Sequence, residues 1–139
     1  MKKTLAEIQK CIELMQQLRN PNSGCPWDLK QDHASLAPYL IEEAQECYDA
    51  IQEKEMGAIQ EELGDLLLQI LFHCQLAAEA KQFTLAEVAQ TLSEKLVRRH
   101  PHIFGTEEEK KLRDVLTPEE VLKKWNEIKA QEKQAKIKT

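Results

Sequence analysis

Apolar residues recur at every third or fourth position in five stretches of the chain, and this spacing predicts α-helices. Three of the stretches open with a capping box, in which Thr4, Thr84 or Thr117 is followed three positions later by glutamate. No alternating pattern typical of β-strands competes with these signals. We therefore expect an all-α fold, an antiparallel helical bundle of about five helices, at about residues 4–18, 36–53, 58–80, 85–99 and 118–134.

The stretches between these segments predict the organisation of the chain. Asn, Pro, Ser and Gly dominate residues 20–24, which is typical of a turn, and residues 101–116 are expected to form a loop. With 139 residues the chain is long enough for one domain with a core and too short for two of ordinary size. We expect a single domain over residues 1–139, with its core at about 4–134 and a basic tail at 129–139.

The second and third predicted helices carry a repeated acidic pattern. Glu43 and Glu46 lie one turn apart beside the apolar stripe of their helix, and Glu62 and Asp65 lie in the same way on the next helix. The four positions are mirrored about Lys54, so that Glu43 stands opposite Asp65 and Glu46 opposite Glu62 if the helices form an antiparallel hairpin. The four carboxylates are then expected to converge on one spot.

Convergence of like charges predicts a cation. Two carboxylates ~4 Å apart repel each other by roughly 4 kcal/mol at an effective dielectric constant of about 20. Oxygen-only ligands select hard ions, and Mg²⁺ in particular combines a few carboxylates with waters and substrate phosphates. We therefore expect Mg²⁺ as the cofactor, with Mn²⁺ able to substitute. The alternative is that these acids only cover the solvated faces of two helices.

Composition excludes several classes of protein. The formal charge of −5 argues against nonspecific binding to nucleic acid, and no apolar run is long enough to span a membrane. The four cysteines lack the close spacing of a zinc site or a disulfide framework, and no signal segment precedes the first helix. A cytoplasmic location is expected. None of the four histidines stands three positions after a glutamate, which argues against a di-iron bundle.

Cations and aromatic residues suggest a nucleotide site. Lys95 and Arg99 share one helix face, as do Trp125 and Lys129 on the last helix. Cations near a metal cluster suit a polyphosphate, because phosphate oxygens that are not on the metal need charge-assisted donors. Trp27, in a rigid turn before the first acidic helix, is placed to line a nucleobase pocket. The alternatives are surface cations, a core or rim tryptophan, and a Trp27 that plugs the bundle end.

The third predicted helix is apolar around much of its circumference, with a run of apolar residues over 66–68 and 70–72. Such a helix requires burial on more than one side. A homo-oligomer, either a dimer or a tetramer, would supply that burial. The alternative is the central helix of a monomeric bundle.

The acidic spacing and the sequence motifs around it resemble the MazG branch of the all-α nucleoside triphosphate pyrophosphohydrolases. The matching motifs are GCPWD at 24–28, APYLIEEAQE at 37–46, EELGDLLLQILFH at 61–73, KLVRRHPHIFG at 95–105 and WNEIK at 125–129. The resemblance covers nearly the whole chain and corresponds to one copy of a domain that longer members carry twice.

The resemblance implies an α-helical fold, obligate oligomers, Mg²⁺ dependence and hydrolysis of nucleoside triphosphates to the monophosphate and pyrophosphate, a reaction that serves nucleotide-pool housekeeping. By position, it implies a role in metal binding for one set of residues and in nucleotide binding for another. The metal set is Glu43, Glu46, Glu62 and Asp65, and the nucleotide set is Lys95, Arg99, Trp125 and Lys129.

The expected mechanism is metal-assisted hydrolysis, in which a carboxylate orients or deprotonates the attacking water. Glu42, Glu46 and Glu61 are all candidates for this role, and water can attack either the α or the β phosphorus. The alternative function, from a different class, is a noncatalytic helical module that binds Mg²⁺ and nucleotide without turning the nucleotide over.

Overall fold

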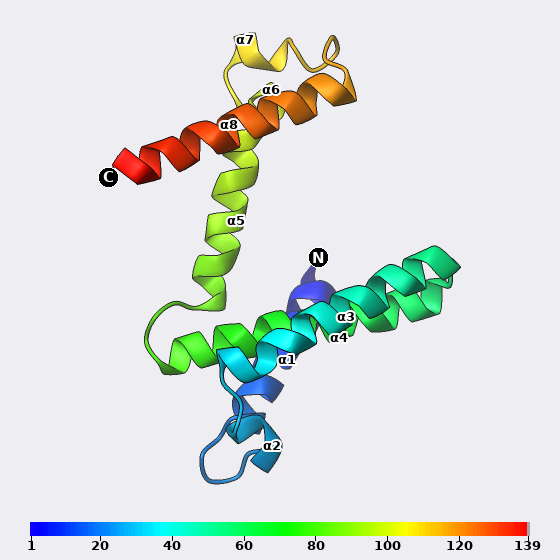
Figure 1. The fold of residues 1–139 in the computed structure, drawn as a ribbon, viewed down its shortest axis with the longest axis vertical. Coiled ribbons are helices and arrows are strands. Elements are labelled where there is room, and N and C mark those ends of the chain that lie inside the picture. Colours follow the sequence, from blue (N-terminus) through cyan, green and yellow to red (C-terminus); the bar gives the residue numbers. More distant parts are fainter. Residues whose placement is uncertain (139) are drawn as a thin grey trace. The chain divides into compact units, whose positions relative to one another are not determined.

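A computed structural model describes the backbone of residues 1–138 and the side chains through residue 136, and every regular element in this range is a helix (Figure 1). The chain divides into two compact units, one over Met1–Leu85 and another that begins at Ala86. The all-α fold is confirmed, and the single domain stays a prediction. The helices are α1 (Lys2–Leu18), α2 (Pro26–Leu29), α3 (His33–Glu53), α4 (Met56–Glu79), α5 (Leu85–Arg99), α6 (Pro101–Phe104), α7 (Glu107–Lys110) and α8 (Pro118–Lys138).

The five long helices are those that the sequence predicts, with corrections at their ends. Helix α1 begins at Lys2 with Met1 as its N-cap, so Thr4 lies inside the helix and the predicted capping box there is wrong. Helical hydrogen bonding already begins at Met1, whose carbonyl accepts from the Leu5 amide at 3.0 Å. Thr4 therefore lies within the first turn and does not cap the helix. The capping box at Thr117 is confirmed, because the Glu120 amide donates to the Thr117 hydroxyl at 3.2 Å.

Helix α3 begins at His33, three residues before the predicted start. A capping box of Asp32 and Ser35 supplies the earlier start: the Ser35 amide donates to the Asp32 carboxylate at 2.7 Å, and the Asp32 amide donates to the Ser35 hydroxyl at 2.9 Å. These bonds satisfy amides that the first turn of a helix leaves without partners.

The predicted loop at 101–116 is partly wrong, because it contains the two short helices α6 and α7. Pro101 occupies the first position of α6, where its missing amide costs no helical bond. Helix α7 begins with a capping box in which the Glu109 amide donates to the Thr106 hydroxyl at 3.2 Å. This box has the same threonine-to-glutamate spacing as the three that the sequence prediction used.

Helices α3 and α4 lie side by side as an antiparallel hairpin (Figure 1). The turn is at Lys54, which ends α3 in the left-handed region with φ 60° and ψ 26°. Helix α1 packs on α4, and the buried core of this unit joins Met15 of α1, Leu36 of α3, and Phe72 and Leu76 of α4. The hairpin register predicted about Lys54 is thus confirmed, and the core holds it in place.

Two further contacts connect the ends of these helices. Arg19, just after α1, pairs with Glu79 of α4 at 2.6 Å and donates to the Asp28 carbonyl at 2.7 Å.

Gly24 allows the chain to turn back sharply, because a Cβ there would lie 2.3 Å from the carbonyl oxygen of Leu18. The predicted turn at 20–24 is therefore confirmed.

Candidate metal centre

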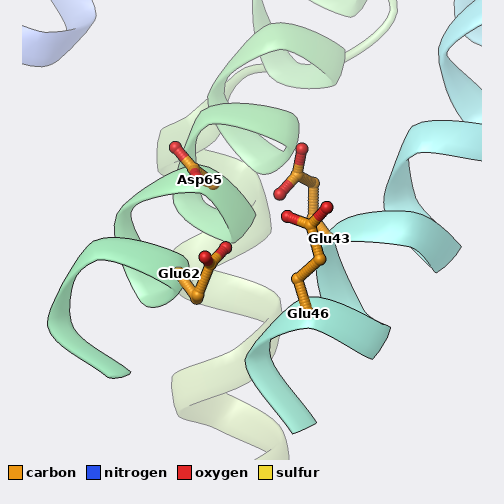
Figure 2. Close-up of side chains that lie close together, drawn as sticks. All are labelled: Glu43, Glu46, Glu62 and Asp65. Carbon is orange, nitrogen blue, oxygen red and sulfur yellow. The ribbon is translucent and has the colours of Figure 1, made fainter. Parts of the chain in front are cut away.

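Four carboxylates from the α3–α4 hairpin converge on one spot. Glu43 and Glu46 project from α3, and Glu62 and Asp65 project from α4 toward them (Figure 2). One oxygen of each residue lies within 4.8 Å of one oxygen of every other. The sequence prediction that these residues meet is therefore confirmed in its geometry.

Local structure explains the convergence. Each helix carries its two acids three residues apart, which is slightly less than one turn, so both point to the same side. The buried Cys47 and Ala50 of α3 hold the adjoining face of that helix against the protein interior. Because the hairpin turns at Lys54, the two acidic turns come to the same height.

The cluster is electrostatically strained. Loss of water around Glu43, together with repulsion from Glu46, raises the pKa of the Glu43 carboxyl to about 6 from its ordinary 4.5. The pKa of Glu62 is also raised, first by desolvation and then by the charge of Glu46. Asp65 adds to both shifts. The free energy of this arrangement falls if protons or a cation neutralise the acids.

Two carboxylate oxygens in the cluster have no partner. The Oε2 atoms of Glu43 and Glu62 are buried and accept no hydrogen bond from the residues that the structure describes. A buried carboxylate oxygen without a donor is costly, and a cation between the helices would satisfy both. The donor set of four carboxylates, with no nitrogen or sulfur among them, fits a hard divalent ion.

Of the three candidate general bases, only Glu46 belongs to the convergent cluster. Glu42 and Glu61 are exposed, yet each stands beside a ligand candidate and contributes to its raised pKa: Glu42 to that of Glu43, and Glu61 to that of Glu62. Their role in catalysis stays a prediction.

The predicted nucleotide-binding cations and Trp125 belong to the unit that begins at Ala86. The guanidinium of Arg99, at the end of α5, lies over the Trp125 ring of α8, 5.0 Å from its centroid. Lys95 is half-buried and Lys129 is exposed, and neither makes an ion pair with another residue in the described part of the chain. The structure thus joins Arg99 to Trp125, and the nucleotide role of all four residues stays a prediction.

Sequence reasoning missed Glu132, which pairs with Arg98 and Arg99. Glu132 follows Lys129 by three positions and Trp125 by seven, so the three share one face of α8. This spacing was available as a signal. What the sequence lacks is any indication that the face meets the end of α5, more than thirty residues earlier.

Trp27 of α2 belongs to the first unit. Its indole makes edge contacts with Tyr39 and Phe72, with ring centroids 5.9 and 6.5 Å apart. The residue remains 49% exposed, so it does not fill the core. Its predicted place in a nucleobase pocket is untested.

Comparison with known proteins identifies relatives in sequence and in structure. Residues 31–104 match the model of the MazG nucleotide pyrophosphohydrolase domain. The chain is 48% identical over 126 residues to the nucleoside triphosphate pyrophosphohydrolase/pyrophosphatase MazG of Thermotoga maritima, a match that covers 91% of this chain and 45% of the relative. It is 39% identical over 130 residues to the nucleoside triphosphate pyrophosphohydrolase of Escherichia coli K12, covering 94% of this chain and 47% of the relative.

The chain therefore spans less than half the length of these two relatives. The crystal structure of a MazG-related protein from Thermotoga maritima has the same fold, with a TM-score of 0.66 at 27% identity. That similarity covers 88% of this chain and 98% of the solved one.

The strained cluster predicts a pH dependence of stability in the absence of metal. The Glu43 pKa in the folded protein lies above its ordinary value, so its contribution to stability is complete below pH 4.5 and is lost as the pH rises through about 6. Removing the charge by Glu43→Gln should therefore raise the melting temperature relative to the parent, by a margin that grows between pH 4.5 and 7.

Thermal melts in EDTA at several pH values measure this difference. Glu53→Gln, an exposed acid on the same helix but outside the cluster, is the matched control and should show a constant margin. If the Glu43→Gln margin is also constant across this range, the cluster is not electrostatically strained.

Proposed function

Because the chain belongs to the MazG nucleotide pyrophosphohydrolase family, we propose that it is a Mg²⁺-dependent enzyme that hydrolyses nucleoside triphosphates to the monophosphate and pyrophosphate. The names of the Thermotoga and E. coli relatives support this class of reaction. The observation that carries the proposal is the convergence of four carboxylates, two of them with a buried oxygen that has no hydrogen-bond partner among residues 1–136.

In this proposal the four carboxylates of Glu43, Glu46, Glu62 and Asp65 hold the metal. When bound, Mg²⁺ neutralises phosphate charge and makes a nearby water more acidic, and Mn²⁺ has the oxygen affinity to replace it. Glu46 is the exposed member of the cluster, so it can reach a water as well as the metal. Together with Glu42 and Glu61, it is a candidate to orient that water or take its proton.

The cationic residues would hold the rest of the substrate. Arg99 presents a planar guanidinium that is already fixed against Trp125, and such a fork matches the geometry of phosphate oxygens. Lys95 and Lys129 each share a helix face with one of these residues. In the proposal they bind the triphosphate, with Trp125 packing against the nucleotide.

We also propose that the working form is a homo-oligomer, a dimer or a tetramer. The outer face of α3 exposes large apolar side chains, including Ile41 at 75% and Tyr48 at 58%. On α4, Leu63, Leu68 and Ile70 are each at least 41% exposed. Apolar faces of this extent on two neighbouring helices are typical of surfaces that another subunit covers.

Product analysis tests the proposed reaction. The purified chain with Mg²⁺ should convert triphosphates to monophosphate and pyrophosphate, as resolved by ion-exchange chromatography. Glu46→Gln and Glu62→Gln should each lower turnover by about a hundredfold or more, because charge stabilisation at the transition state is lost. Both variants should remain folded in melts without metal, since a repulsive charge has been removed.

The exposed Glu53→Gln serves as the matched control and should keep full turnover. Release of nucleoside diphosphate and orthophosphate would show that a different phosphoanhydride bond is hydrolysed and would contradict the proposed reaction. Binding of Mg²⁺ and nucleotide without turnover would favour the noncatalytic binding module instead.

Removing the cationic side chains should weaken binding of the triphosphate more than binding of the monophosphate. A charge-assisted contact contributes roughly 1.5–3 kcal/mol, so Lys95→Ala and Arg99→Ala should each cost about ten- to a hundredfold in affinity for a nonhydrolysable triphosphate with Mg²⁺. The monophosphate should lose less. Trp125→Ala should weaken both ligands, and the triphosphate more, because the indole packs against the nucleotide and also fixes the Arg99 guanidinium.

Isothermal titration measures these affinities. Lys123→Ala, an exposed lysine on a different face of α8, is the control and should leave them unchanged. Small and equal effects from all the variants would mean that these residues only cover the helix surface.

The apolar face predicts the mass in solution. Sedimentation velocity should give the parent a mass of at least two 16.1 kDa chains, and Ile41→Glu should shift it toward a single chain, because a charge at a buried interface has no partner. Gln16→Glu adds the same charge at an exposed position of α1, outside the apolar faces of α3 and α4, and should not change the mass. A parent that sediments at 16.1 kDa rules the oligomer out.

A further inference from the structure

Two consecutive arginines hold one carboxylate in the unit that begins at Ala86. Arg98 Nε donates to Glu132 Oε1 at 2.5 Å, while Arg99 donates to Oε2 from Nη2 at 2.8 Å and from Nε at 3.3 Å. Each carboxylate oxygen therefore faces its own guanidinium. We call Arg98 and Arg99 the arginine fork.

The Arg99 half of the fork is fixed in place, whereas the Arg98 side chain is 51% exposed. Arg99 is only 9% exposed, and its guanidinium lies over Trp125, whose ring also packs edge-on against His100 at 5.3 Å between centroids. An arginine that is fixed by an aromatic face loses little further freedom when it binds an anion. This rigidity favours a site that recognises an anion by shape as well as by charge.

A second observation comes from His102, three residues after Arg99 in the chain. This residue is 8% exposed, and its Nδ1 atom is buried with no partner among the described residues. Its ring lies 5.7 Å from that of His100, which contacts Trp125. Burial lowers the pKa of His102, and the nearby His100 and Lys124 lower it further. A buried polar atom without a partner, beside several cationic groups, points to a ligand that completes the site.

Glu132 offers both of its carboxylate oxygens to the fork. It shares the α8 face with Trp125 and Lys129, two of the residues assigned to the nucleotide. A carboxylate and a phosphate both offer paired oxygens to a guanidinium, so a phosphate group can accept the same hydrogen bonds that the Glu132 carboxylate accepts.

We propose that the arginine fork is a polyphosphate-binding site and that Glu132 is its internal competitor, which a phosphate group displaces on binding. This inference rests on the proposed function for the identity of the anion, and it adds Arg98 and Glu132 to the residues that act on the substrate. The two arginines hold Glu132 so strongly in its charged form that its pKa falls to about 2. In this exchange, the singly charged Glu132 carboxylate is replaced by a polyphosphate that carries more negative charge.

Neutralising Glu132 tests the competition. Glu132→Gln should bind inorganic tripolyphosphate about tenfold more tightly than the parent, in EDTA so that the metal cluster takes no part, because one charge-assisted contact no longer competes. The gain for orthophosphate should be smaller, in line with its lower charge. Glu127→Gln removes the same charge from another face of α8 and should leave both affinities unchanged.

Each other outcome overturns the proposal. Unchanged affinity in a folded Glu132→Gln protein would make the ion pair a structural tie between α5 and α8. Weaker binding would mean that Glu132 positions Arg99 for the phosphate instead of competing with it. Circular dichroism of both variants establishes that they are folded.

A measurement on the parent keeps the test decisive if Glu132→Gln does not fold. Both arginines donate their Nε–H groups to Glu132, so their ¹⁵N–¹H signals report the exchange of carboxylate for phosphate. Adding tripolyphosphate should shift both signals together, and signals that do not move exclude the site. Turnover is assayed separately with Mg²⁺, so a chain that binds tripolyphosphate through the fork but hydrolyses nothing would refute the proposed function alone.

Discussion

The main constraint on the first unit is the mutual repulsion of four carboxylates, which the rest of the unit must hold close together. Glu43, Glu46, Glu62 and Asp65 are held with oxygens within 4.8 Å of one another, an arrangement that the free side chains would avoid. The α3–α4 hairpin maintains it, because the core of Met15, Leu36, Phe72 and Leu76 and the Arg19–Glu79 ion pair hold the end of the hairpin opposite its turn. Stability gained in the core thus offsets strain at the site, as is common where a site is built for a ligand.

The unit that begins at Ala86 uses the opposite arrangement of charge. There the clustered groups are cationic, and one carboxylate, that of Glu132, neutralises the arginine fork from within the chain. The acidic cluster has no such internal partner, since two of its buried oxygens lack any donor among the described residues. Taken separately, the acidic cluster has the charge that suits a cation, and the fork has the charge that suits an anion.

The sequence predicted most of the helices and the whole acidic cluster. Helix α5 has the predicted bounds, and the turn at Lys54 is where the mirrored acids place it. Errors occurred where local signals compete. Reciprocal capping boxes at Thr106 and at Asp32 start α7 inside the predicted loop and start α3 three residues before its predicted beginning. At Thr4 a helix that begins two residues earlier made the capping signal irrelevant.

What the sequence by itself determined is the phase of each helix: acids three residues apart on two helices joined by a short turn converge whenever the helices pair, because the period of the α-helix is constant. Only the tertiary structure decided which of these groups lose water. The raised pKa of Glu43, the unpartnered oxygen of Glu62 and the pairing of Arg99 with Glu132 all depend on burial and on contacts between separate helices. Helical periodicity carries no information about such contacts, since it describes the faces of one helix and not the surface that each face meets.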